Sequence, residues 1–295
     1  MKLKNHSIKL FDAVIILFCL LSGTYLFLGI NQLDQITFHL MARIGILTVI
    51  FFITRVTMDN QRIMKLLRNF YPLLILPFFY SETDYYNNLL FNNLDPLLIN
   101  LEKLLFNTQL SLRFPEAIPQ PWFSEMMHGA YFSYYLMTLG IPLLIYLKKP
   151  GKFNFVMFII TFSFCSYYIL FFLFPSTGPQ FYFPKAQQVV PEGYLFQKIM
   201  HFILEVAETE TGAFPSSHVG LGTVFLILIY KYFKKFSWMF FLLYILLILS
   251  TIYIKAHYAI DTLAGIITGI LFYFSGKFIF KRFSEKNSLS YSPIK

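Results

Sequence analysis

Long apolar stretches separated by short polar connections dominate the chain. A helix needs roughly 20 mostly apolar residues to cross the hydrocarbon core of a bilayer, and eight stretches come near or exceed that length. The pattern therefore predicts an all-α polytopic membrane bundle of about eight transmembrane helices. The predicted spans are residues 11–30, 38–56, 64–80, 126–147, 153–174, 215–230, 238–254 and 258–280.

The charged residues divide between alternate connections. Most of the 24 Lys and Arg residues lie in the two tails and in the connections after the second, fourth and sixth spans, whereas the acidic residues gather in the other connections. Cytoplasmic loops carry the Lys/Arg excess. We therefore expect both termini in the cytoplasm and two long outer segments, at about 81–125 and 175–213. The membrane is expected to be the plasma membrane, or the inner membrane if the protein is bacterial.

Composition narrows the classes further. The 295 residues are 57% hydrophobic and only 13% charged, which excludes a disordered chain and a disulfide scaffold. The net charge of +9 is explained by membrane topology, so no nucleic-acid partner is expected. We divide the chain into N-terminal spans with an outer loop (1–125), a membrane core (126–283) and a cytoplasmic tail (284–295).

The outer ends of the later spans carry three polar clusters, of which the second surrounds Pro215. Proline is favoured at the first helical position, and the amides after it then lack helical partners. Ser216, Ser217 and His218 follow it and predict an anion site with a titratable proton donor. The alternative is an ordinary serine cap with a nearby histidine.

The third cluster ends in His257 and Asp261, which are spaced i, i+4. On a helix both side chains share one face, so the carboxylate can accept the Nδ1 proton and leave Nε2 as a nucleophile or base. Lys255 offers a cation for a phosphate oxygen. The alternative is a His–Asp pair that only tethers the helix end.

Taken together, the clusters supply what phosphoryl transfer through a phospho-histidine needs. Such a reaction requires a nucleophile, a group that orients it, an acid for the leaving oxygen and donors around the phosphoryl oxygens. No metal or cofactor is expected, because the histidines lack the companions of a zinc site.

The motifs Pro215-Ser216-Ser217-His218 and Ser250-x6-His257-x3-Asp261 resemble the type 2 phosphatidic acid phosphatase (PAP2) superfamily, over residues 153–281. The family signatures are Lys-x6-Arg-Pro, Pro-Ser-Gly-His and Ser-Arg-x5-His-x3-Asp. The resemblance implies a helical core in which His257 is the nucleophile, Asp261 orients it and His218 protonates the leaving group. Ser216, Ser217 and the neighbouring amides would hold the phosphate.

Two motifs depart from the family pattern. Ser176-Thr177-Gly178-Pro179-Gln180 replaces the basic first motif, and Thr251 replaces the arginine of the third. With these changes the chain resembles the branch of the family that contains the inositol phosphorylceramide synthases. Members of that branch share Ala-Phe-Pro-Ser-x-His and His-Tyr-x-x-Asp with this chain. The phosphate site would then rely on Lys255 and Lys185, with Gln180 as an uncharged donor.

Four further residues are candidates for contact with a lipid headgroup. They are Tyr182 and Lys185 after the first cluster, and Glu125 and His128 at the outer end of the fourth span. A single Glu-x-x-His does not make a di-iron site, which needs two such motifs. Arg43 lies inside the second span and is expected to pair with a carboxylate or reach a cavity.

The sequence thus predicts a phosphotransferase or phosphoesterase that acts on a membrane lipid phosphate or phosphodiester at the outer leaflet. A simple lipid phosphatase, of the phosphatidate or polyprenyl pyrophosphate type, differs only in using water as the acceptor. A lipid or solute transporter with a His–Asp proton relay is also compatible with the sequence. So is a silent homologue that binds lipid without turning it over.

Overall fold

The computed structural model describes residues 8–55, 62–207 and 209–289, so Lys2, Lys4 and the last six residues lie outside it. The described residues form helices and no strands, which confirms the predicted all-α class. The helices are α1 (Leu10–Leu28), α2 (Ile36–Arg55), α3 (Arg62–Tyr86), α4 (Asp95–Phe106), α5 (Leu110–Ala117), α6 (Pro121–Lys148), α7 (Phe153–Leu173), α8 (Pro179–Tyr182), α9 (Lys185–Gln188), α10 (Leu195–Ala207), α11 (Ser217–Tyr232), α12 (Ser237–Tyr253) and α13 (Ala259–Leu289).

Each of the eight predicted spans coincides with a helix in the structure. Six of these helices, α1, α2, α6, α7, α12 and α13, are long and apolar enough to cross a membrane. The other two are α3, which carries charged residues near both ends, and α11, which is apolar but only 16 residues long. Helix α13 continues to Leu289, so the tail predicted from residue 284 begins as the last turns of this helix.

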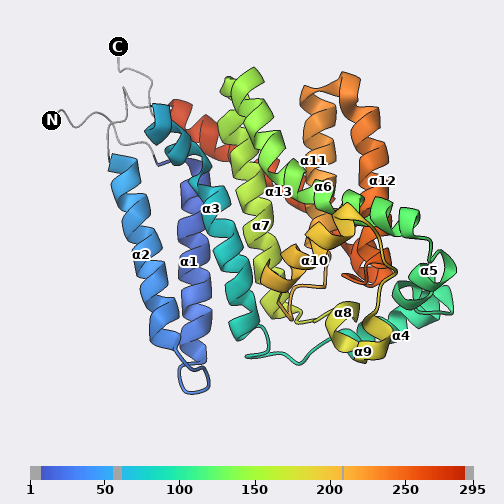
Figure 1. Cartoon of the computed structure of the whole chain (residues 1–295). Helices are drawn as coiled ribbons and strands as arrows, with labels where there is room; N and C mark the ends of the chain where they lie inside the picture. The colour runs from blue at the N-terminus through green and yellow to red at the C-terminus, as the bar shows by residue number, and fades with distance from the viewer. Residues whose placement is uncertain (1–7, 56–61, 208, 290–295) are drawn as a thin grey trace, which may run out of the picture.

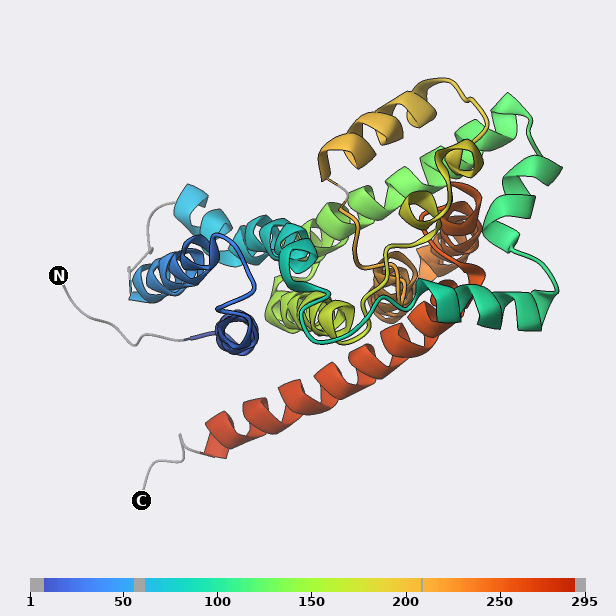
Figure 2. The same cartoon turned by 90° about the horizontal axis from the view of Figure 1, so that it is seen from below.

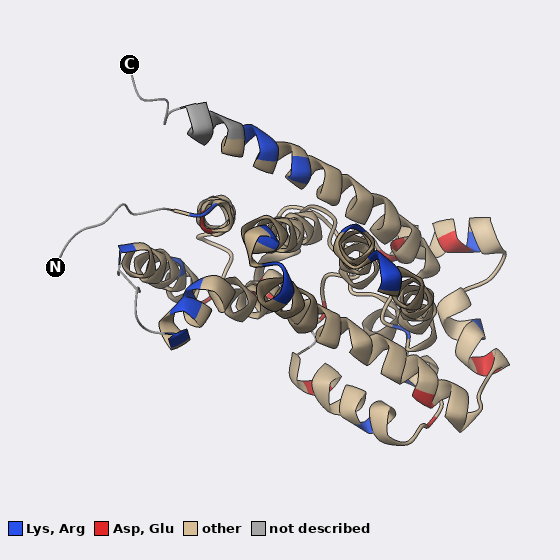
Figure 3. Ribbon diagram, turned by 90° about the horizontal axis from the view of Figure 1, so that it is seen from above, with Lys and Arg blue, Asp and Glu red and all other residues tan. Residues whose placement is uncertain are grey.

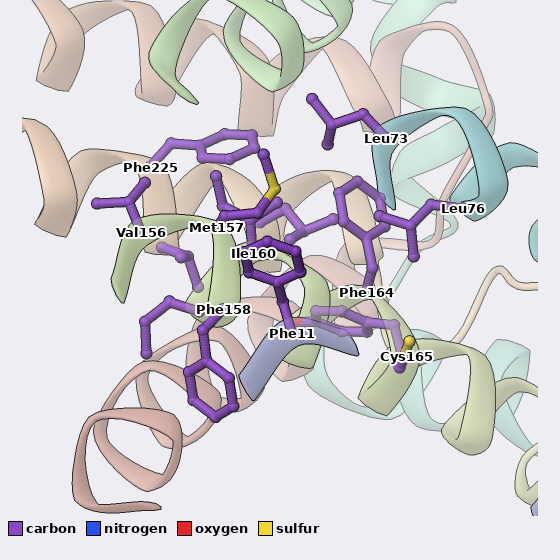
Figure 4. Close-up of a cluster of buried hydrophobic side chains, with 14 of the residues drawn as sticks. Phe11, Leu73, Leu76, Val156, Met157, Phe158, Ile160, Phe164, Cys165 and Phe225 are labelled. Carbon is purple, nitrogen blue, oxygen red and sulfur yellow. The ribbon is translucent and has the colours of Figure 1, made fainter. Parts of the chain in front are cut away.

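Helix α7 lies at the centre of the bundle and contacts α1, α3, α6, α11 and α13 (Figure 1). Its side chains are almost all apolar, as expected for a helix surrounded by others. Figure 4 shows Val156, Met157 and Phe164 of α7 packed with Phe11 of α1 and Phe225 of α11. The helices α1–α3 form a unit on one side of α7, α6, α11 and α12 lie on the other, and α13 runs obliquely past α7 (Figures 1 and 2).

Helices α11 and α13 approach closely because glycine lies at their contact. A Cβ on Gly265 of α13 would lie 2.6 Å from the carbonyl oxygen of Ser216, at the start of α11. Glycine is the residue that permits such a backbone approach. The contact brings the start of α11, which carries His218, against the segment that carries His257 and Asp261. Viewed from below, α13 runs obliquely across the other helices (Figure 2).

The two ends of the bundle differ in charge. Both ends of the described chain lie at one end of the bundle, and the Lys and Arg residues of the adjoining connections gather there (Figures 1 and 3). The short helices α4, α5, α8 and α9 lie at the opposite end. The alternation of charge along the sequence therefore corresponds to a separation in space.

Within the predicted outer segment at about 81–125, the chain between α3 and α6 folds into two helices, α4 and α5. Asn107 ends α4 in a left-handed conformation, with φ of 55°, and α5 begins three residues later. The buried face of α4 consists of Asp95, Leu98 and Glu102. Because α4 packs against α13, these two carboxyl groups lie within the protein and beside the predicted site.

Candidate active site

The three predicted clusters meet as three loops joined by backbone hydrogen bonds. Ser176 of the first loop accepts hydrogen bonds from the Ala213 amide, at 3.3 Å to its carbonyl, and from the Phe214 amide, at 2.7 Å to its hydroxyl. The Gln180 amide donates to the Lys255 carbonyl at 3.0 Å. The Ser216 amide donates to the Asp261 carbonyl at 3.0 Å. The clusters therefore form one unit.

Gly178 lies where the three loops are closest. Its φ is +85°, and a Cβ there would lie 2.9 Å from the Ala213 side chain and 3.0 Å from the Ala256 carbonyl oxygen. Both the backbone conformation and the space require glycine. The first cluster thus contributes a tightly packed turn in place of the basic residues of the family signature.

The two histidines face each other across the loops. The Nδ1 atom of His218 lies 3.3 Å from Nε2 of His257, a residue that is 3% exposed. The Nδ1 atom of His257 lies 2.8 Å from the Ala213 carbonyl oxygen. A carbonyl oxygen only accepts, so Nδ1 of His257 carries the proton and Nε2 keeps its lone pair when the ring is neutral. The hydrogen bond between the rings is then donated by His218.

Asp261 does not take the position predicted for it. His257 lies in the loop before α13, so the i, i+4 geometry of a helix does not apply. The Asp261 carboxylate turns toward the start of its own helix and accepts a hydrogen bond from the Tyr258 amide at 2.8 Å. Its Oδ2 lies 3.7 Å from Nδ1 of His257, which is too long for a hydrogen bond. The Ala213 carbonyl orients the ring instead.

Lys255 also differs from the prediction. Its ammonium group donates to the carbonyl oxygens of Gln187 and Val189, at 2.6 and 2.7 Å, so two backbone acceptors occupy the cation that was predicted to meet a phosphate oxygen. Burial lowers the pKa of this ammonium group, because a desolvated charge is disfavoured. The backbone of Lys255 is left-handed, with φ of 65°, and shapes the turn that leads into His257.

The serines of the second cluster lie at the start of α11, as the proline pattern predicts. Ser216 is the residue before the helix, and its buried hydroxyl accepts a hydrogen bond from the Val219 amide at 3.3 Å. Ser217 is the first helical residue and is 8% exposed. An ordinary serine cap is therefore present, beside a histidine pair that the cap alone does not explain.

Asp95 of α4 is a buried carboxylate that accepts hydrogen bonds from two of the loops. Asp95 accepts hydrogen bonds from the Thr177 amide at 2.7 Å, the Gly178 amide at 2.9 Å and the Tyr258 hydroxyl at 2.8 Å. These donors come from the first loop and from the third, which are distant in the sequence. Asp95 thus links the first loop to the residue that follows His257.

A second carboxyl on α4, that of Glu102, lies under the start of α13. Its Oε1 accepts hydrogen bonds from the Ala259 amide at 3.3 Å and the Leu110 amide at 3.1 Å. Burial raises the pKa of this carboxyl to about 7, although the two amides act in the opposite direction. The group fixes the end of the helix that carries Asp261.

Three tyrosine rings of α6 surround His218. The ring centroids of Tyr131, Tyr134 and Tyr135 lie 4.6, 4.3 and 6.4 Å from that of His218. Tyr131 is fully buried and Tyr134 is 6% exposed. His218 is thus held between the His257 ring and a group of aromatic rings.

The predicted headgroup residues lie elsewhere. Glu125 accepts hydrogen bonds from the amides of residues 194–197 and so fixes the start of α10. His128 is buried, with Nδ1 2.7 Å from the Ser124 carbonyl oxygen. Tyr182 and Lys185 are exposed on α8 and α9, and within the described residues no hydrogen bond or ring contact joins either to the histidine pair. The structure brings none of these four side chains to the pair.

Several residues of the site could not be recognised from the sequence. The Ala213 carbonyl leaves no trace in a side-chain pattern. Asp95 had a weak signal, since it begins a helix as Asp-Pro. The spacing of Tyr131, Tyr134 and Tyr135 marks one helix face, but it also fits ordinary packing.

Comparison with known proteins identifies the family. A family model described as the PAP2 superfamily matches residues 98–274, which include both histidines and all three loops. No curated protein and no solved structure matches the chain. Among the described residues no group of three or more His, Cys, Asp or Glu side chains is placed to hold a metal ion. The family match covers more than half of the sequence, and the chain therefore belongs to the PAP2 superfamily.

Proposed function

We propose that the protein transfers phosphoryl groups of membrane lipids, with His257 as the nucleophile and His218 as the proton donor. The observation that carries this proposal is the 3.3 Å approach of His218 Nδ1 to His257 Nε2, with the Ala213 carbonyl on the opposite side of the His257 ring. Membership of the PAP2 superfamily, whose enzymes are generally of the phosphatase type, supports the same chemistry.

In the first step the substrate phosphoryl group enters between the two rings. The lone pair of His257 Nε2 forms a bond to phosphorus, the bond from phosphorus to the lipid oxygen breaks, and His218 gives its proton to that oxygen. In the second step an acceptor hydroxyl attacks phosphorus, the phosphorus–nitrogen bond breaks, and His218 takes the acceptor's proton. The cycle restores both histidines.

The charge on the phosphoryl oxygens needs donors that are already in place. The first amides of α11, at Ser217 and His218, have no acceptor within their helix and can supply them. Gln180 is held beside the His257 loop by its amide and is proposed to donate from its side chain. Asp261 lies behind His257 and is proposed to stabilise the imidazolium through space, because its carboxylate is 3.7 Å away.

The proposed substrate is a lipid phosphate or phosphodiester of the outer leaflet. A cavity of about 980 Å³ lies beside Lys255, between α4, α5 and the segment before α10. Its lining contains the cations of Lys103, Arg113 and Lys255 and the carboxylates of Glu116 and Glu192, which supports a role in binding a polar headgroup or acceptor. We further propose transfer to an alcohol, as in the inositolphosphotransferase-like branch, with both termini cytoplasmic and the histidines on the outer side.

The test is an assay of the full-length protein in detergent micelles with phosphatidate and with a phosphoinositol lipid. His257→Ala and His218→Gln are expected to lower turnover by about 10³-fold or more, because the groups of a catalytic unit fail together. His201→Ala, on the exposed face of α10, is the matched control and should keep full activity. Full activity of both site variants would remove the mechanism.

The nature of the acceptor is measured in the same assay. Addition of an alcohol acceptor should divert the phosphoryl group from water into a new ester if the enzyme is a transferase. Unchanged release of inorganic phosphate from phosphatidate, or of inositol phosphate from the phosphoinositol lipid, over a wide range of acceptor concentration identifies hydrolysis instead.

A further inference from the structure

The tyrosines around His218 share one face of α6. Tyr131, Tyr134 and Tyr135 are spaced i, i+3 and i+4, which places them together on a helix surface. The Tyr131 and Tyr134 rings are tilted by 32° and 52° to the His218 ring, and Tyr135 meets it nearly edge-on at 73°. The two nearer rings thus lie against the His218 ring, tilted to it, at centroid distances of 4.6 and 4.3 Å.

This arrangement addresses a problem in the proposed chemistry. His218 must carry an extra proton to protonate the leaving oxygen, yet a half-buried cation loses part of its hydration and is disfavoured without compensation. The faces of aromatic rings carry negative charge and attract a cation within about 6 Å. Tyr131 and Tyr134 lie within that distance, so they can compensate the positive charge. A neighbouring carboxylate could accept the proton from His218, whereas a ring cannot.

The other titratable groups near His218 do not take this role. From the loop before α13, His257 faces it and, when protonated, repels a second positive charge. Asp261 lies behind His257, with its carboxylate on the Tyr258 amide. On α12 and α7, the hydroxyls of Tyr244 and Tyr167 are each bonded to a threonine hydroxyl.

We propose that Tyr131 and Tyr134 are positioning residues that hold the His218 ring and favour its protonated form. The inference rests on the proposed function, since it assigns His218 the role of the acid. It adds that the acid is served by α6, a helix that carries none of the three motifs. The property that matters is the ring face, and the hydroxyl group is dispensable.

The test is the pH dependence of kcat/KM for Tyr134→Leu and Tyr131→Leu, with Tyr134→Phe as the matched control. The basic limb of the profile marks loss of the proton from the acid. Removal of a ring face makes the imidazolium less favourable, so each leucine variant should move this limb to lower pH by about 0.5 to 1 unit. The phenylalanine variant should keep the limb of the unchanged protein.

The position of the limb does not depend on how much of a variant is folded, so partial misfolding leaves the test intact. A basic limb that stays in place in both leucine variants would overturn the inference. The His218→Gln variant separates this failure from that of the proposed function. If it retains the activity and the basic limb, His218 is not the acid and the proposed function itself is wrong.

Discussion

The α1–α3 unit and the histidine site both bury charged side chains, but they stabilise them in different ways. In the unit, Arg43 of α2 donates to Glu82 of α3 at 2.9 Å, and Arg68 of α3 pairs with Asp12 of α1. Each of these buried charges has a partner of opposite sign on another helix. At the site, the buried carboxylate of Asp95 is held by backbone amides and hydroxyl groups.

The difference indicates two purposes for buried charge. Pairs between helices join those helices where water is absent and apolar contact alone gives little preference. A carboxylate that collects donors from two loops instead fixes the position of those loops. We therefore expect damage in the α1–α3 unit to reduce stability, and damage at the α4 carboxylate to reduce turnover.

The largest effect is expected from Glu82→Gln. The substitution leaves the Arg43 charge buried without its counter-ion, and loss of one partner of a buried pair costs about 3 to 5 kcal/mol. Thermal unfolding in detergent should show this loss, whereas kcat of the folded protein should stay unchanged. The double variant Arg43→Met/Glu82→Leu should regain most of the stability. A large fall in the kcat of the folded Glu82→Gln protein would contradict the comparison.

The next effect in size is expected from Asp95→Asn. The amide nitrogen is itself a donor and faces other donors at Thr177, Gly178 or Tyr258, so the loops must shift. A displacement of about 1 Å at a catalytic group costs about 10²-fold in rate. We therefore expect kcat to fall by about that factor with little change in KM. Asp34→Asn, on an exposed connection, is the control and should retain its activity.

The helices themselves could be predicted because a bilayer restricts the choices. Every predicted span contains a helix, since each apolar stretch satisfies its backbone only in that form. The segment between α3 and α6 was less predictable. Its break at Asn107 and the inward face of α4 depend on contacts with α13 that local sequence does not encode.

The site divides in the same manner. His218 and His257 could be identified because their motifs are local, and the structure brings them together. The hydrogen-bond partner of His257 could not be predicted. The i, i+4 argument assumed that one helix holds both His257 and Asp261, whereas α13 begins at Ala259, after His257. The proper partner is the carbonyl of Ala213, a residue from another loop, and only the folded chain reveals it.

The third effect concerns pH and Glu102. Burial raises the pKa of this carboxyl from 4.5 to about 7, so folding favours the protonated form. Stability from this group is then complete below pH 4.5 and is lost as pH rises toward 7, by up to about 1.4 kcal/mol per pH unit. Glu102→Gln should flatten the dependence of the unfolding temperature on pH in that window. An equally steep dependence in the variant would exclude Glu102 as its cause.

The smallest effect is expected for an exposed ion pair, which belongs neither to the buried pairs of α1–α3 nor to the histidine site. Arg113 and Glu116 are 3.2 Å apart on α5, and their side chains are 72% and 63% exposed. Exposed pairs contribute about 0 to 1 kcal/mol, because water screens both charges. Glu116→Gln should therefore shift the free energy of unfolding by less than about 1 kcal/mol. If Glu116→Gln lowers the free energy of unfolding as much as Glu82→Gln does, the loss depends on pairing and not on burial. The comparison between the two regions would then be wrong.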